Sequence, residues 1–209
     1  STCSSPRASR PPCAPAARRL VQSAQKYGLP VERLGDCVQA WDVDPHQVAI
    51  TQQRLTAALR SWGLSTQVAH RLCQAWIRVG DFLLEPLPCG FDVVVGNPPY
   101  VRIEELGKTE RAAYRARYTT LFDRADVYVA FVERALSLLS ARGLLSFVCA
   151  DRWTKNRYGA KLRRLISERF AVHTYIDLGS SAPFVDAVTA YPSIFVIGRK
   201  TDAPSQPVT

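Results

Sequence analysis

The stretch of sequence that decides the fold is residues 91–100, Phe-Asp-Val-Val-Val-Gly-Asn-Pro-Pro-Tyr. Its apolar, β-branched start at residues 91–95 predicts a strand covered on both faces of a sheet. The two consecutive prolines fix the backbone and remove two N–H donors, so the nearby carbonyl oxygens have no local partner. Asn97 adds a side-chain carbonyl and Tyr100 a flat aromatic face. This rigid group suits a planar molecule that carries an amino group, and an ordinary strand-to-loop turn is the alternative.

Strands and helices alternate on both sides of this stretch, which predicts an α/β fold. The pattern favours one open, mostly parallel, twisted sheet with helices on both faces. In such sheets ligands bind beyond the carboxyl ends of the strands, which is where residues 97–100 follow their strand. We expect strands near residues 38–43, 75–79, 91–95, 143–149, 172–178 and 193–197, and helices near residues 16–27, 44–62, 125–139 and 158–170.

Composition excludes several classes of protein. Hydrophobic residues make up 47% and charged residues 22% of the 209, enough to bury a core. No apolar run reaches the roughly 18 residues of a membrane-spanning helix. The net charge of +9 suits a polyanionic partner. The six cysteines are scattered without a C-x-x-C pair, and the three histidines are dispersed. We therefore expect reduced thiols in a cytoplasmic protein, with no metal site.

The two ends of the chain differ from its middle. Residues 1–16 hold four prolines and no Val, Ile, Leu or Phe, which predicts an irregular basic Pro/Ser-rich tail. This tail is either simply disordered or an arm that binds nucleic acid. Residues 17–199 form the predicted catalytic domain, and residues 200–209 a C-terminal tail. The chain contains no Met, so we expect a fragment.

Gly96-Asn97-Pro98-Pro99-Tyr100 resembles the catalytic motif of S-adenosylmethionine-dependent methyltransferases that modify amino or amide nitrogens. Together with residues 80–84, it resembles the N6-adenine DNA methyltransferases of restriction–modification systems, with a gamma-like motif order. The resemblance covers about residues 16–199 and implies a Rossmann-like methyltransferase fold. It implies that Asp42 binds the cofactor ribose and that Asp81 and Phe82 bind its adenine, with Asn97 also beside the cofactor.

The resemblance also implies how DNA is held. A flipped adenine donates its amino hydrogens to Asn97 and to the Pro98 backbone carbonyl, and no protein nucleophile or metal takes part. Tyr100 stacks on one face of the base. Phe184 sits where a second stacking aromatic is expected, although it could equally be a core residue. Residues 151–170 hold seven basic and two acidic residues; they either contact phosphates, through Arg152, Lys155 and Arg157, or form a solvated helix face.

Two expected parts of the family are missing from this sequence. No glycine-rich turn or apolar strand precedes Asp42, so we expect an incomplete sheet with a gap at its first strand and weak cofactor binding. No target-recognition domain follows residue 199, so specificity requires a separate subunit or a missing domain. Methyl transfer to RNA or to protein glutamine stays an alternative to double-stranded DNA. So does an inactive remnant that only binds nucleic acid.

Overall fold

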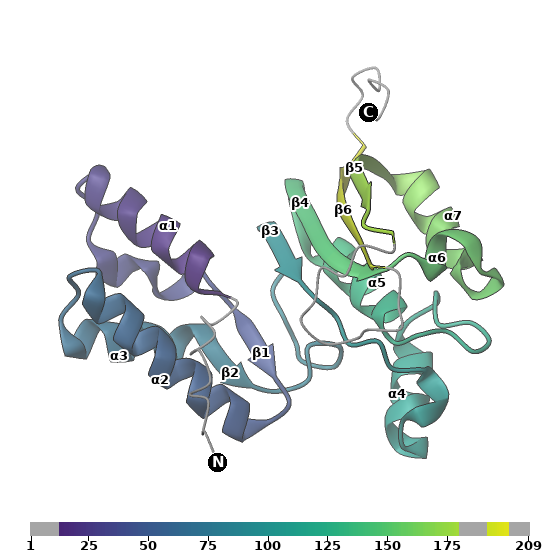
Figure 1. The fold of residues 1–209 in the computed structure, drawn as a ribbon, viewed down its shortest axis with the longest axis horizontal. Coiled ribbons are helices and arrows are strands. Elements are labelled where there is room, and N and C mark those ends of the chain that lie inside the picture. Colours follow the sequence, from purple (N-terminus) through teal and green to yellow (C-terminus); the bar gives the residue numbers. More distant parts are fainter. Residues whose placement is uncertain (1–12, 180–191, 201–209) are drawn as a thin grey trace, which may run out of the picture. The chain divides into compact units, whose positions relative to one another are not determined.

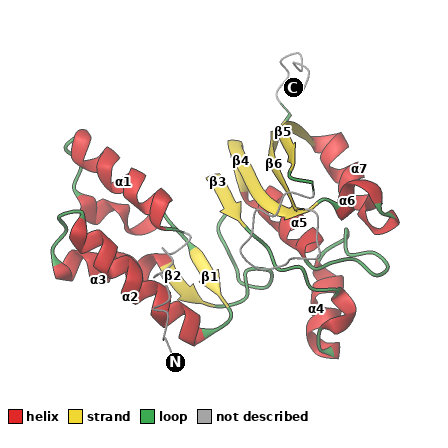
Figure 2. Ribbon diagram, in the orientation of Figure 1, coloured by secondary structure: helices red, strands yellow, loops and turns green. Residues whose placement is uncertain are grey.

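A computed structural model of the chain describes residues 13–179 and 192–200 (Figures 1 and 2). The chain divides after Glu85 into two compact units, and each is described by itself. Phe184 lies outside the described residues, as do most of the two predicted tails.

Over residues 13–85, the first unit contains three helices and a pair of short parallel strands. Local signals start the second and third of these helices. The Asp44 carboxylate accepts from the His46 N–H at 2.8 Å, and the Ser65 hydroxyl accepts from the Val68 N–H at 3.3 Å. In order, the elements are α1 (Ala14–Lys26), a 3-10 turn (Val31–Asp36), β1 (Ala40–Asp42), α2 (Pro45–Ser61), α3 (Thr66–Trp76) and β2 (Ile77–Val79).

The core of the first unit is formed by the apolar faces of its helices. Trp76 at the end of α3 is fully buried, and its indole N–H donates to the backbone carbonyl of Leu34 at 2.7 Å. Such a bond lets a large aromatic side chain be buried without an unsatisfied donor. The helix side chains around it repeat at intervals of three or four residues, as in Ala17, Val21, Leu55, Leu59 and Leu72.

In its described residues, 86–179 and 192–200, the second unit is a four-stranded sheet with helices against it. The strand order is β3-β4-β6-β5; β3 and β4 are parallel, whereas β6 is antiparallel to both of its neighbours. β3, β4 and β5 therefore run in the same direction, and β6 runs in the opposite direction between β4 and β5. The elements are β3 (Phe91–Gly96), a 3-10 turn (Ile103–Glu105), α4 (Lys108–Arg117), α5 (Tyr128–Leu138), β4 (Leu139–Ala150), α6 (Arg152–Lys155), η3 (Arg157–Gly159), α7 (Ala160–Arg169), β5 (Phe170–Asp177) and β6 (Pro192–Arg199).

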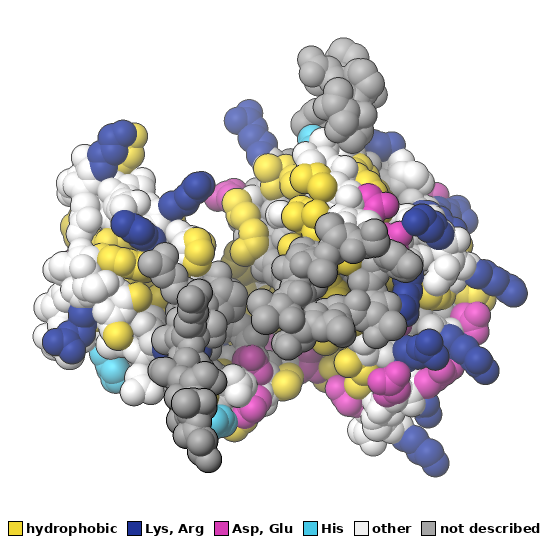
Figure 3. Space-filling view, in the orientation of Figure 1, with side chains coloured by type: hydrophobic (Ala, Val, Ile, Leu, Met, Phe, Trp, Pro, Cys, Tyr) yellow, Lys and Arg dark blue, Asp and Glu magenta, His cyan; other side chains and the backbone are white. Residues whose placement is uncertain are grey.

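The predicted strands and helices are present within a few residues of their expected bounds. α3, α4 and α6 were not expected, and β4 begins at Leu139, four residues earlier than predicted. The expectation that β3 is covered on both faces is wrong, because Val93 and Val95 are each 61% exposed. Hydrophobic side chains reach the surface over this sheet (Figure 3). Residues 91–95 are mostly apolar, but whether a strand is buried depends on which other elements pack against it. The sequence of the strand itself does not contain that information.

Both sheets have an unpaired edge. Within residues 13–179 and 192–200, β1 pairs only with β2, and β3 pairs only with β4. In the described part of the chain, no helix combines the length and apolar character needed to cross a bilayer.

Candidate functional site

Asp42 and Asp81, predicted to bind the cofactor, lie at the same edge of the first unit. The parallel register places Asp42 opposite Val79, so both strands end at this edge. The Gly80 N–H donates to the Asp42 carbonyl at 2.9 Å and extends the pairing by one residue. Asp81 follows immediately. The carboxyl ends of two neighbouring parallel strands thus carry one acidic residue each, as the general rule for ligand sites in α/β sheets predicts.

Each of these carboxylates also holds its own turn. Asp42 Oδ1 accepts from the Asp44 N–H at 2.9 Å, and Asp81 Oδ1 accepts from the Leu83 N–H at 2.8 Å. Gly80 has a specific reason to be glycine, because a Cβ there would lie 2.8 Å from the Trp41 ring. These turns keep the two carboxylates at the edge of the sheet.

The residue types at this edge fit the nucleoside part of a cofactor. Asp42 is exposed, whereas Asp81 and Phe82 are partly exposed. Carboxylate oxygens accept hydrogen bonds from vicinal hydroxyls, and a phenyl ring offers a surface for a planar base. The chemistry of the set therefore agrees with the roles that the resemblance implies for it.

In the second unit, residues 97–100 leave the carboxyl end of β3 with alternating exposure. Pro98 is buried, whereas Asn97 and Pro99 are exposed. The buried proline ring anchors the loop, and its fixed φ limits the motion of the neighbouring carbonyls. The Asn97 amide lies at the surface rather than in the core, so its carbonyl is accessible to a ligand.

Tyr100 is held in place on two sides. Its hydroxyl donates to the Val148 carbonyl of β4 at 3.4 Å, and its ring meets that of Tyr128 edge-on, with centroids 6.4 Å apart and an interplanar angle of 88°. Burial, with a smaller contribution from Cys149, raises the pKa of Tyr100 to about 12. The phenol is therefore neutral at physiological pH, and its partly exposed ring is available for stacking.

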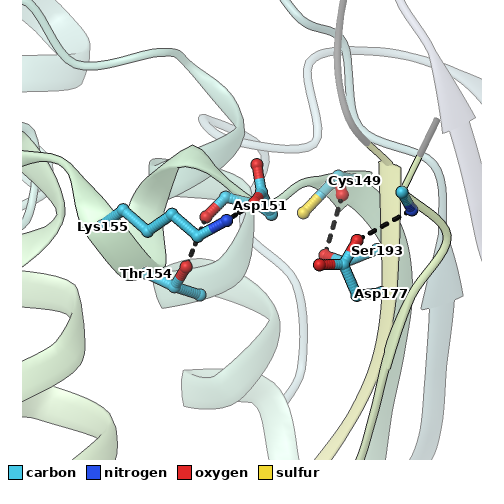
Figure 4. Close-up of polar contacts among 7 residues, drawn as sticks. Cys149, Asp151, Thr154, Lys155, Asp177 and Ser193 are labelled. Carbon is cyan, nitrogen blue, oxygen red and sulfur yellow. Dashed lines mark hydrogen bonds and ion pairs between the residues drawn. The ribbon is translucent and has the colours of Figure 1, made fainter.

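The predicted phosphate-binding residues lie on α6 and η3, and one of them has an acidic partner. Lys155 Nζ is 2.6 Å from Asp151 Oδ2, and Asp151 is only 4% exposed (Figure 4). The hydrogen bond and the charge of Asp151 raise the pKa of Lys155, so its ammonium is fixed over a buried carboxylate. Arg157 is exposed and Arg152 partly so. Lys155 thus contributes less net charge to this surface than the sequence suggested.

Sequence reasoning did not identify a buried polar group behind Tyr100. The sequence predicts helices near residues 125–139 and 158–170 and no contact between their first residues. In the structure the Tyr158 hydroxyl donates to Asp126 Oδ2 at 2.8 Å and lies 3.0 Å from the Tyr128 hydroxyl. The sequence did contain a signal for this group. Asp126 lies just before a strongly apolar helix, and a carboxylate that is buried there needs hydrogen-bond partners. In the described ranges, no three His, Cys, Asp or Glu side chains cluster as metal ligands would.

Comparison with solved structures defines the fold class. A protein of Listeria monocytogenes assigned to the class I S-adenosylmethionine-dependent methyltransferases aligns over 94% of this chain and 54% of its own, with a TM-score of 0.56 and 18% identity. The M protein of the type I restriction enzyme EcoKI aligns over 79% of this chain and 31% of its own, with a TM-score of 0.56 and 16% identity. The fold is that of the S-adenosylmethionine-dependent methyltransferases.

Sequence comparison then gives the family. Residues 36–184 match the family model of the Eco57I restriction-modification methylases, and the chain belongs to that family. It is 46% identical over 179 residues to the type II methyltransferase M.PaeR7I of Pseudomonas aeruginosa, covering 86% of this chain and 31% of the relative. It is 42% identical over 185 residues to M.XhoI of Xanthomonas vasicola, covering 87% of this chain and 34% of the relative. The chain therefore spans about a third of the length of these curated relatives.

Proposed function

We propose that this chain carries the catalytic residues of a DNA methyltransferase that transfers a methyl group from S-adenosylmethionine to the N6 amino group of a flipped adenine. The observation that carries the proposal is the loop at the end of β3. It combines an exposed Asn97 amide, a buried Pro98 and a partly exposed, anchored Tyr100 ring. Membership of a restriction-modification methylase family supports DNA as the substrate.

The chain's own residues bind and orient the amino group. The Asn97 side-chain carbonyl and the Pro98 backbone carbonyl accept its two hydrogens, which turns the nitrogen lone pair toward the methyl donor. The same bonds stabilise the positive charge that develops on the nitrogen during transfer. Tyr100 stacks on one face of the base, and Phe184 is assigned to the other face. Because Pro98 is buried, these acceptors need little reorganisation when the base arrives.

Asp42, Asp81, Phe82 and Asn97 are the residues that would hold the cofactor. Asp42 accepts from the ribose hydroxyls, whereas Asp81 and Phe82 contact the adenine. When bound, S-adenosylmethionine supplies a methyl group on a positively charged sulfur. The reaction therefore asks the protein for positioning and charge stabilisation rather than for a nucleophile.

Arg152, Lys155 and Arg157 are assigned to phosphate contacts. Lys and Arg side chains project from the part of the second unit that carries α6 and α7 (Figure 3). Arg157 is exposed and has the planar donor set that suits phosphate.

Transfer of a radiolabelled methyl group to duplex DNA tests the proposal. The purified chain is incubated with labelled S-adenosylmethionine and unmethylated duplex, and the DNA is then digested to nucleosides. We expect the label in N6-methyladenine. Label in N4-methylcytosine would overturn the adenine assignment, and label only in parallel RNA or release-factor protein samples would overturn the DNA assignment. Salt-sensitive DNA binding without any labelled product would identify an inactive remnant.

We further expect weak cofactor binding by this chain. In the described ranges β1 pairs only with β2 and β3 only with β4, and residues 1–41 contain no glycine-rich turn for the methionine part. Isothermal titration calorimetry with S-adenosylmethionine measures the affinity directly. Tight, stoichiometric binding would contradict this expectation while leaving the methylation assay to decide the reaction.

A further inference from the structure

Two buried polar side chains, Asp126 and Tyr128, and the half-buried Tyr158 connect the basic segment at residues 152–158 to Tyr100. Tyr128 is fully buried and Asp126 is 6% exposed. The Tyr158 hydroxyl donates its single hydrogen to Asp126 Oδ2 at 2.8 Å. The Tyr128 hydroxyl, 3.0 Å away, therefore donates to the Tyr158 oxygen. The chain of bonds runs from Tyr128 through Tyr158 to Asp126, and it partners a carboxylate that would otherwise be costly to bury.

One end of this chain of bonds contacts Tyr100. The Tyr128 ring meets the Tyr100 ring edge-on with centroids 6.4 Å apart. The backbone beside Asp126 also pairs with the residues that follow Tyr100. The Val127 N–H donates to the Val101 carbonyl at 2.8 Å, and the Ile103 N–H donates to the Ala125 carbonyl at 3.0 Å. Residues 125–128 therefore support both the Tyr100 ring and the backbone after it.

The middle member of this chain of bonds, Tyr158, is fixed within residues 152–158. Tyr158 lies in η3, next to Gly159, where a Cβ would be 1.9 Å from the Trp153 carbonyl oxygen. Arg163 Nη1 donates to the same carbonyl at 2.6 Å and to the Asn156 carbonyl at 2.9 Å. These contacts join the turn that carries Tyr158 to α6. A change in position of that segment would thus be transmitted to the Tyr158 hydroxyl.

We infer that Tyr158 is a positioning residue, which couples the basic segment at residues 152–158 to the orientation of the Tyr100 ring through Asp126 and Tyr128. The inference rests on the proposed function, because it needs Tyr100 to stack on the target base. Phosphate binding by the basic segment holds Tyr158 in place, and Tyr158 in turn keeps the Tyr128 edge against the Tyr100 ring. The DNA backbone and the flipped base are then bound by parts of one connected structure.

The substitution Tyr158→Phe, made in the full chain, tests this coupling. It removes one hydroxyl and both of its hydrogen bonds but keeps the ring. We expect the methylation rate at saturating DNA to fall about ten-fold, the size of effect that one such bond provides, while the DNA dissociation constant stays within about two-fold. Asp126→Asn retains an acceptor oxygen and should keep most of the activity, whereas Asp126→Ala should resemble Tyr158→Phe.

A spectroscopic readout separates positioning from general support of the fold. In a duplex with 2-aminopurine at the target position, stacking on Tyr100 quenches the fluorescence of the flipped base. We expect this quenching to weaken in Tyr158→Phe at unchanged DNA affinity. Tyr114→Phe is the matched control, since its hydroxyl lies 3.1 Å from a Glu110 carboxylate oxygen within α4. It should behave like the unmodified chain in both assays.

The outcomes distinguish the inference from the proposed function. If the unmodified chain transfers methyl groups and Tyr158→Phe matches it in rate and quenching, the inference alone is overturned. Equal losses in Tyr158→Phe and Tyr114→Phe would also overturn it, because they would indicate a general effect on the fold. If the unmodified chain transfers nothing, the proposed function is overturned and the inference falls with it.

Discussion

Replacing Asn97 by alanine is the sharpest test of the loop after β3. The residue is exposed, so the free energy of unfolding should change by no more than about 0.5 kcal/mol. The substitution removes one of the two acceptors assigned to the reacting amino group. Loss of one such contact in a transition state lowers turnover about 10²- to 10³-fold. At 1.36 kcal/mol for each ten-fold change, this corresponds to about 3–4 kcal/mol.

Single-turnover methylation at saturating DNA and cofactor measures that loss directly. The DNA dissociation constant, measured separately, should stay within about two-fold, because phosphate contacts dominate affinity. Gln53→Ala is a suitable control, since it removes an exposed amide from α2 in the first unit. If Asn97→Ala kept more than a tenth of the rate with unchanged folding, the side-chain carbonyl would not be a principal acceptor.

Three further predictions concern stability and ionisation. Glu133→Ala removes a carboxylate that accepts four hydrogen bonds from residues 119–120, and should lower the free energy of unfolding by about 1.5–3 kcal/mol in urea titrations. Gly159→Ala, with its Cβ 1.9 Å from a carbonyl oxygen, should cost about 1–3 kcal/mol, whereas Gly107→Ala, with nothing within 4 Å, should be neutral. The pKa of Tyr100 is raised to about 12, so the stability that its neutral phenol contributes is present below pH 10 and is lost as the pH rises toward 12. The phenolate absorbance that is absent from Tyr100→Phe measures the titration of this group. A midpoint near pH 10 would contradict the prediction.

Local signals in the sequence were sufficient for much of the fold. A helix near residues 44–62 is predicted from the sequence, and in the structure α2 begins at Pro45 with Asp44 as its cap. α3 was missed although Ser65 precedes a repeat of apolar residues at intervals of three and four. Its own sequence contained the signal, so this was a failure of interpretation rather than of information.

Other features could not be read from the sequence because they depend on distant contacts. The exposure of Val93 and Val95 follows from which elements lie beside β3, and nothing within the strand encodes that. The Asp126–Tyr158 bond joins residues 32 positions apart. Asp81 and residues 97–100 follow closely on the ends of β2 and β3, as the βα order predicts, and Asp42 is the last residue of β1. The chemical roles of these residues stay predictions. The ion pair of Lys155 with Asp151 could have been predicted from the sequence, because side chains four residues apart lie next to each other on a helix.

The place of β6 in its sheet has a consequence for synthesis of the protein on the ribosome. β5 leaves the ribosome before β6, and in the described part of the chain its strand partner is β6. During that interval β5 and β4 each lack the neighbour that later joins them. The nascent chain therefore presents open strand edges until residues 192–199 emerge, which is the period when a chaperone would protect it from aggregation.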